Sequence, residues 1–283
     1  MIHIPVLQKE VLDYLDPKPN ENFIDCTFGE GGHTSAILEK NKPFGKVLGI
    51  DWDLKNRDFK RVILICDNFV NLKNIVKKIK FGPISGILFD LGMSSWQIDQ
   101  SGRGFSFLRD EPLDMRYAKN KSLTAEEIIN EWSEEEIIRI LKEYGEERFA
   151  KRITKEIIEK RKIKPIKSTF QLVQIIKTAV PLWYQHKRIH CATKTFQALR
   201  ITVNDELNNL KNVLPSALDV LEPGGRIVVI SFHSLEDRIV KHFFKNNIKF
   251  LKILTKKPIK PSEEEIKINP RSRSAKLRAV IKL

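Results

Sequence analysis

The chain has 283 residues, 41% of them hydrophobic, which is enough for one large domain or two ordinary ones, and no apolar run approaches the ~18 residues of a membrane span. It also lacks a secretory leader, so we expect a cytoplasmic protein that does not contact a membrane. Its three cysteines (Cys26, Cys66 and Cys191) are odd in number and widely spaced without a CxxC pair, which argues against a disulfide framework and against a metal site.

The charge balance is strongly basic. The 50 lysines and arginines exceed the 36 aspartates and glutamates, and the formal net charge is +14. Such a chain attracts polyanions at long range, although a basic composition also occurs in proteins that never bind nucleic acid.

The first informative element is a strand followed by a glycine-rich turn, FIDCTFGEGGH, which begins at Phe23. The apolar run predicts a short buried strand, and residues 33–40 begin a helix. Gly29, Gly31 and Gly32 lie between them, where the missing Cβ atoms allow positive φ and a close approach of a ligand to the backbone. The helix N-terminus adds unpaired N–H groups. The turn predicts a nucleotide-like ligand, with a plain tight connection as the alternative.

A second predicted strand, residues 46–51 (KVLGID), ends in a carboxylate. Asp51 follows Gly32 by nineteen residues, close to the ~20 that separate a ribose-binding acid from its glycine turn. A helix cap or turn former is the alternative for this residue. The turn does not match GxGxxG, and Asp25 just before it would repel a pyrophosphate. A carboxylate there suits a cationic ligand such as S-adenosylmethionine.

Two further predicted strands, residues 62–67 (VILICD) and 84–90 (ISGILFD), also end in aspartates. Four acids would then line the carboxyl edge of one parallel sheet, where ligands of open α/β folds bind. Between the second and third strands, residues 54–61 (LKNRDFKR) are too few for the usual intervening helix. Residues 221–230 (LEPGGRIVVI) supply another strand, and the expected class is α/β with a Rossmann-like sheet.

The alternation of strands and helices stops between about Ser106 and Asp205. Helical periodicity predicts a helix over 126–144, begun by a capping box of Thr124 and Glu127, and two more helices at 146–162 and 168–180. The expected division is a sheet domain made of 1–105 and 206–283 and an all-helical insertion at 106–205.

A loop of unusual polarity, DLGMSSWQIDQSGRGFSF, opens at Asp90 directly after a strand. It combines glycines and serines with two glutamines, an arginine and, near its end, an aromatic pair. Because a structural loop rarely needs so many polar groups beside a ligand-binding edge, residues 90–97 are the candidate floor of the reaction site.

Two later segments carry further candidates. Gln197, Arg200 and Asn204 recur at helical spacings of three and four and could face one groove, with a salt-bridged surface helix as the alternative. His233, in SFHSLEDR, follows a strand near the same edge and could contact substrate, although a lone histidine more often has a structural role.

The chain resembles the 16S ribosomal RNA cytosine-N4 methyltransferases. The blocks that carry the resemblance are HIPVLQKEV, TFGEGGH, DLGMSSWQID, RGFSF, PLDMR, YGEERFAKRI, TFQALRITVNDEL, LEPGGR, SFHSLEDRIVK and NPRSRSAKLRA, in the family's order over nearly the whole length. The resemblance implies a class I S-adenosylmethionine-dependent methyltransferase sheet, Rossmann-like, whose inserted helical domain serves RNA recognition.

The resemblance also implies an activity and its contacts. The activity would be methylation of the N4 amino group of a cytosine in the decoding region of 16S rRNA, within the small ribosomal subunit, by a monomer or homodimer. Phe69 would stack on the adenine of the cofactor. The implied cofactor-binding residues are Gly31, Gly32, His33, Asp51, Phe69, Asp90 and Gln97.

A cytosine amine is a poor nucleophile because its lone pair is delocalised into the ring. The site must accept its N–H hydrogens and hold it in line with the methyl group. Asp90 is the candidate catalytic acceptor, although no Pro-Pro-aromatic loop follows it. The base must also leave its stack, so the substrate-binding candidates are aromatic and cationic: Phe105, Phe107, Arg200 and His233.

Three alternatives remain open from the sequence. A nicotinamide dehydrogenase would share the sheet, but the GEGG turn and the strand-end acids argue against it. A methyltransferase acting on an amino group of DNA or of another RNA would share the chemistry. A non-enzymatic RNA-binding assembly protein would explain the charge of +14 but not the acids.

Overall fold

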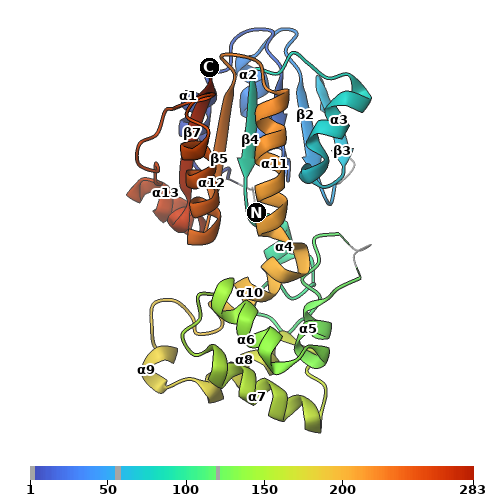
Figure 1. Ribbon diagram of the computed structural model, residues 1–283, viewed down its shortest axis with the longest axis vertical. Coiled ribbons are helices and arrows are strands. Elements are labelled where there is room, and N and C mark those ends of the chain that lie inside the picture. Colours follow the sequence, from blue (N-terminus) through green and yellow to red (C-terminus); the bar gives the residue numbers. More distant parts are fainter. Residues whose placement is uncertain (1–3, 55–58, 119–121) are drawn as a thin grey trace. The chain divides into compact units, whose positions relative to one another are not determined.

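The computed structural model describes residues 4–54, 59–118 and 122–283. They divide into two compact units, a sheet unit (Met1–Gly92 with Leu207–Leu283) and a helical unit (Met93–Glu206). Figure 1 shows that the N-terminal strands, in blue, and the C-terminal strands, in orange and red, belong to the same sheet. The two ends of the chain therefore build one unit together.

The described residues of the sheet unit form a seven-stranded sheet in the order β3-β2-β1-β4-β5-β7-β6. The first five strands run parallel, whereas β7 is antiparallel to both β5 and β6. The strand order reverses between β1 and β4, which is the point where open α/β sheets bind ligands. The strands are β1 (Phe23–Asp25), β2 (Val47–Asp51), β3 (Val62–Cys66), β4 (Gly86–Asp90), β5 (Arg226–Ser231), β6 (Leu251–Ile253) and β7 (Lys276–Lys282).

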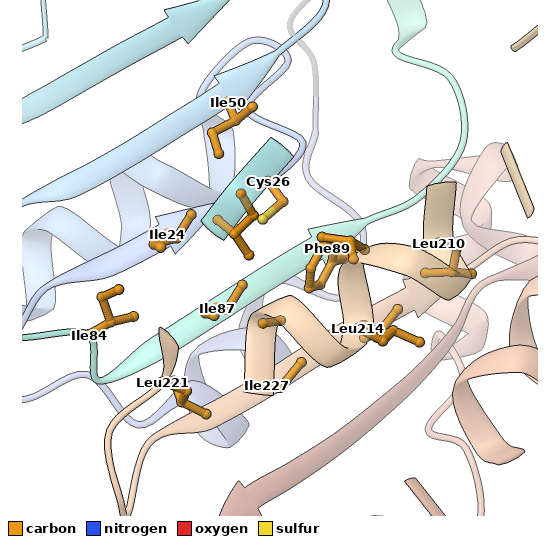
Figure 2. Packing of buried hydrophobic residues seen from close by; sticks show 14 of the residues in the cluster. Ile24, Cys26, Ile50, Ile84, Ile87, Phe89, Leu210, Leu214, Leu221 and Ile227 are labelled. Atoms are coloured by element: carbon orange, nitrogen blue, oxygen red, sulfur yellow. The ribbon is translucent and has the colours of Figure 1, made fainter. Parts of the chain in front are cut away.

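Helices cover both faces of this sheet. Successive residues of the central strands pack into opposite hydrophobic clusters: Ile87 and Phe89 into one, Leu88 into the other. Figure 2 shows the first cluster, which contains Ile87 and Phe89 together with Leu214 of α11. Because both faces are buried, the strands are continuous apolar runs and do not alternate with polar residues. The helices of this unit are α1 (Gln8–Leu15), α2 (Gly32–Lys40), α3 (Leu72–Ile79), α11 (Glu206–Val220), α12 (Ser234–Asn246) and α13 (Glu263–Ile268), with 3-10 turns η1 (Phe69–Asn71) and η2 (Pro270–Ser274).

The fold class predicted from the sequence is confirmed. The order and direction of the strands are those of an α/β fold with a Rossmann-like sheet, and an all-helical segment is inserted after β4. In the segment after Asp51, residues 55–58 lie outside the described residues, and the described remainder up to β3 contains no helix.

The helical unit corrects one prediction. In place of a single helix over 126–144, the chain forms α5 and α6, which are separated at Trp132. Ser133 begins α6 with a capping box to Glu136, and this local pairing stops the helix that the apolar periodicity extends. The predicted capping box at the start of α5 is confirmed, as are helices at the two later positions. The helices are α4 (Ser95–Asp99), α5 (Ala125–Glu131), α6 (Glu134–Glu143), α7 (Ala150–Ile163), α8 (Thr169–Ala179), α9 (Leu182–Gln185) and α10 (Thr193–Asn204).

In the described part of the chain, no helix combines the length and the apolar character that crossing a membrane requires.

Phe89 provides a test of the core. Its ring is fully buried on β4 and meets Phe69 edge-on at a centroid distance of 5.9 Å. We expect Phe89→Ala to lower the free energy of unfolding by about 3–5 kcal/mol, measured by urea denaturation, because it leaves a cavity. Phe44 of the same unit is 75% exposed, and Phe44→Ala should change stability by less than about 0.5 kcal/mol. Equal losses in the two variants would contradict this description of the core.

Candidate functional site

Three carboxylates end adjacent parallel strands. Asp25, Asp51 and Asp90 are the last residues of β1, β2 and β4, which are neighbours in the sheet. Their side chains therefore lie at one edge, as predicted. Asp67, the fourth predicted acid, follows β3 and accepts hydrogen bonds from the Asn68 N–H at 2.6 Å and from Asn71 Nδ2 at 2.9 Å. Its carboxylate is thus engaged at the start of η1.

The turn beside these acids admits only glycine at two positions. Gly31 has φ +78, and a Cβ built on it would lie 2.8 Å from the ring of Phe28 and 2.9 Å from that of Phe59. A Cβ on Gly32 would lie 2.4 Å from the ring of Pro5. These rings fill the space that a side chain at either position would need, so both positions favour glycine at the start of α2.

Asp51 connects the second strand to this turn. Its Oδ2 accepts the Gly29 N–H at 2.7 Å, and its Oδ1 accepts the Asp53 N–H at 3.2 Å. Burial raises the pKa of Asp51 to about 6, and the two backbone hydrogen bonds oppose that rise only in part. The carboxyl group therefore changes charge just below neutral pH.

Two threonines hold the other two acids in place. Asp25 is 1% exposed and accepts hydrogen bonds from the Thr34 hydroxyl at 2.7 Å and the Thr27 N–H at 3.2 Å. Burial raises the pKa of Asp25. The Thr27 hydroxyl accepts the Asp90 N–H at 2.7 Å, which ties the end of β4 to that of β1. Sequence reasoning missed both threonines, although they flank the glycines in TFGEGGHT.

His33 is the second residue of α2 and is only 6% exposed. Its Nε2 lies 3.5 Å from Asp90 Oδ2, without a hydrogen bond. Burial lowers the pKa of His33, but the Asp90 and Asp25 carboxylates raise it by more. Both ring nitrogens and Asp90 Oδ1 are buried without a hydrogen-bond partner. Such atoms need explanation in a folded protein, and a polar ligand would supply their partners.

The two remaining cofactor candidates lie in different units. Phe69 begins η1 in the sheet unit and is half-buried. Gln97 lies in α4 of the helical unit, where its Oε1 accepts the Ser94 N–H at 2.9 Å and the Ser94 hydroxyl accepts the Gln97 N–H at 3.2 Å. This capping box leaves the side-chain NH₂ of Gln97 as a donor. The pattern Ser-x-x-Gln signals such a box in the sequence.

The aromatic substrate candidates differ in their surroundings. Phe105 is 6% exposed and stacks on Tyr117 at a centroid distance of 5.5 Å. It is a core residue of the helical unit in this structure. Phe107 is half-buried, stacks on His190 at 4.6 Å and meets Phe196 edge-on.

The three polar residues of α10 do not share one groove, and that prediction is wrong. Gln197 donates to the Tyr144 carbonyl at 2.8 Å. Asn204, 1% exposed, donates to the Met115 carbonyl at 2.8 Å and accepts the Tyr117 N–H at 2.9 Å.

Arg200 makes a third set of contacts, donating to both carboxylate oxygens of Glu206 at 2.8 and 2.9 Å. Each of the three side chains therefore bonds a different segment. These contacts hold the helical unit together.

His233 caps α12. Its Nδ1 accepts the Glu236 N–H at 3.5 Å, its Nε2 lies 3.2 Å from Glu236 Oε1, and Glu236 Oε2 accepts the Phe232 N–H at 2.9 Å. The structure thus gives this histidine the structural role that the sequence left open, at the end of β5.

Comparison with known proteins connects these observations to a family. A family model described as the MraW methylase family matches residues 1–283. Curated proteins named ribosomal RNA small subunit methyltransferase H are similar to the chain: 47% identical in Heliobacterium mobile, over 99% of each chain, and 48% in Halothermothrix orenii, over 98% of this chain and 97% of the relative. The protein of that name from Thermosipho melanesiensis is 51% identical over 98% of this chain and 96% of its own.

Gly31→Ala should destabilise the protein through both backbone and side-chain effects. A non-glycine residue at this φ costs about 1–2 kcal/mol, and the methyl group also meets the rings of Phe28 and Phe59. Gly224 has φ +81 with nothing within 4 Å of the added Cβ, so Gly224→Ala isolates the backbone cost. We expect the larger loss in unfolding free energy for Gly31→Ala. Equal losses would mean that the rings move aside without cost.

Proposed function

Because the chain belongs to the MraW methylase family, we propose that it transfers the methyl group of S-adenosylmethionine to the N4 amino group of a cytosine in the decoding region of 16S rRNA. The relatives named ribosomal RNA small subunit methyltransferase H, similar over nearly the full length, support the RNA substrate. The motif resemblance supports the choice of the cytosine amine. We further propose that the substrate is the rRNA within the small ribosomal subunit.

One observation carries the cofactor assignment: three carboxylates end adjacent strands around a glycine turn. S-adenosylmethionine is positively charged at its amino group and sulfonium, so these acids attract it, whereas they would repel the pyrophosphate of a nicotinamide cofactor. The buried His33 nitrogens and Asp90 Oδ1, which have no hydrogen-bond partner, fit a polar ligand.

Each remaining candidate has a chemical part in this proposal. Asp51 would accept hydrogen bonds from the ribose hydroxyls, as strand-end acids do in Rossmann-like units. Phe69 would contact the adenine with its half-buried ring, and Gln97 would donate its side-chain NH₂ to the cofactor.

The reaction is chiefly a positioning problem for the protein. When bound, S-adenosylmethionine supplies a methyl group that its sulfonium activates. The amine nitrogen forms a bond to the methyl carbon while the carbon–sulfur bond breaks, and the nitrogen then loses one proton to water. Asp90 would accept an N–H of the amine through Oδ1, which has no hydrogen-bond partner, and so aim its lone pair. The Asp90 and Asp25 carboxylates raise the pKa of His33, which favours an imidazolium beside Asp90.

We propose that the helical unit contributes RNA recognition, as the motif resemblance implies, and that the net charge of +14 of the whole chain favours its binding to RNA. Of the substrate candidates, Phe105 is buried, and Arg200 and His233 are paired with carboxylates, whereas Phe107 stacks on His190 but keeps a half-buried ring. Phe107 is therefore the candidate that we retain for base contact.

The central experiment is transfer of labelled methyl from S-adenosylmethionine to three substrates: small ribosomal subunits that lack the modification, free 16S rRNA and duplex DNA. We expect label in the subunits, mapped to one cytosine of the decoding region. Label in DNA but not in RNA would favour the other amino-group methyltransferase. Absence of transfer to any RNA would favour an assembly protein.

Asp90→Ala should reduce methyl transfer at least about 100-fold, because the amine loses its acceptor. Cofactor affinity, measured by titration calorimetry, should fall much less. Asp67→Ala is the matched control, because Asp67 also follows a parallel strand, β3, but accepts its hydrogen bonds from Asn68 and Asn71 at η1. Unchanged turnover in Asp90→Ala, with cofactor binding retained, would exclude the proposed role of Asp90.

The raised pKa of Asp51 predicts a pH-dependent affinity. Above pH 6 the carboxylate is ionised and accepts hydroxyl hydrogens, and below pH 6 protonation should weaken binding by up to about tenfold per pH unit. The free energy of unfolding should change in the opposite direction, because the pKa of Asp51 in the folded protein lies above its ordinary value of 3.8. Above pH 6 the buried charge destabilises the folded state, and this destabilisation disappears as the pH falls below 6.

The control for this dependence is Asp51→Asn, which is neutral at every pH. Asp25 and His33 titrate in both proteins, so the difference between the variant and the natural chain isolates Asp51. Parallel affinity profiles from pH 5 to pH 8 would contradict the assignment.

A further inference from the structure

The helical unit presents an exposed aromatic surface at α9. Trp183 is 51% exposed and the preceding Leu182 is 71% exposed. A tryptophan with half of its surface in water is unusual in a folded unit, because burying an aromatic ring stabilises the fold. Packing within the helical unit does not explain why half of the Trp183 side chain is exposed.

Cations flank the exposed ring. The Arg148 guanidinium carbon lies 5.1 Å from the Trp183 ring centroid, and Lys187 Nζ lies 4.9 Å from it. Both side chains are exposed. These are cation–π distances, at which the ring and the charges are held side by side. We refer to Trp183, Arg148 and Lys187 as the Trp183 platform.

The platform is rich in positive charge. Its two chain segments, residues 148–152 (RFAKR) and 182–188 (LWYQHKR), contain five lysines and arginines, and the adjacent Glu147 carboxylate is buried against Tyr184. In the described part of the chain none of these five side chains forms an ion pair. Their charge is therefore available to an anionic partner.

A buried contact fixes the platform. Tyr184, next to Trp183, is 7% exposed and donates its hydroxyl to Glu147 Oε2 at 2.7 Å. Glu147 is 2% exposed. Phe149 meets both aromatic rings edge-on, at centroid distances of 6.0 Å and 4.9 Å. The exposed ring is thus held in place before any partner arrives, which reduces the entropy cost of binding.

We propose that the Trp183 platform stacks an unpaired base of the RNA substrate, while Arg148 and Lys187 hold the phosphates beside it. Aromatic rings flanked by cations bind single-stranded nucleic acid in this way. The inference rests on the proposed function, which makes RNA the partner. A second copy of this chain fits less well, because a two-fold contact through this surface would bring the same cations together.

The test measures direct binding of a fluorescently labelled single-stranded oligoribonucleotide of about 12 nucleotides, with the same strand in a duplex for comparison. Trp183→Ala should weaken binding of the single strand about tenfold and affect the duplex less. Trp183→Phe should restore most of the affinity. Phe170→Ala, at a 45% exposed ring elsewhere in the helical unit, is the matched control and should bind normally.

The salt dependence of binding tests the two cations, Arg148 and Lys187, separately from the aromatic ring. Arg148→Ala combined with Lys187→Ala should reduce the slope of log affinity against log salt concentration by about 1.4, or ~0.7 for each phosphate contact. Lys160→Ala with Lys164→Ala, two exposed lysines at the end of α7, is the matched control. An unchanged slope in the first pair would overturn the assignment of these two cations.

Unchanged single-strand affinity in Trp183→Ala would overturn the inference. So would a change in oligomeric state by light scattering without a change in RNA binding, which would make the surface an interface between copies. With small subunits as substrate, Trp183→Ala should raise KM and leave kcat unchanged. Failure of the natural chain to methylate any RNA would reject the proposed function, whereas the oligonucleotide assay would still report on the platform.

Discussion

The candidate site depends on keeping three carboxylates at adjacent strand ends. Burial raises the pKa of Asp25 and of Asp51, so the ionised forms cost free energy in the folded protein. The Thr34 hydroxyl and the backbone N–H groups of the turn offset part of that cost. The glycine turn therefore stabilises the ionised acids as well as offering a place for a ligand. A substitution in the turn should affect the acids, and a substitution of an acid should affect the turn.

The sequence predicted this edge well because its signals are local. Each of the first parallel strands is an apolar run that ends at or just before an aspartate, and the position of Asp51 relative to Gly32 depends on one strand, one turn and one helix. The antiparallel β7 between β5 and β6 was not predicted, because strand order depends on pairing between distant segments. The break at Ser133 was missed because a capping box overrode the apolar periodicity.

The substrate residues were harder to predict because residue type does not determine exposure. Phe105 and Trp183 are both aromatic residues near cations in the sequence, yet the first is 6% exposed and the second 51% exposed. Arg200 is adjacent to a helix end where Glu206 is available, and Arg148 is not paired with any carboxylate of the described residues. Tertiary neighbours decide which cation is left for an anionic partner, and spacing along the chain does not contain that information.

The division of the sheet between the two ends of the chain has a consequence for synthesis on the ribosome. When β4 has emerged, its partner β5 is still separated from it by the whole helical unit. At ordinary translation rates, the edge of β4 waits roughly ten seconds for that partner. During this interval the nascent sheet has an apolar strand with unpaired backbone groups, the kind of edge that invites aggregation. The helical unit can fold during the same interval, so the nascent chain exposes a strand edge that β5 covers in the finished protein.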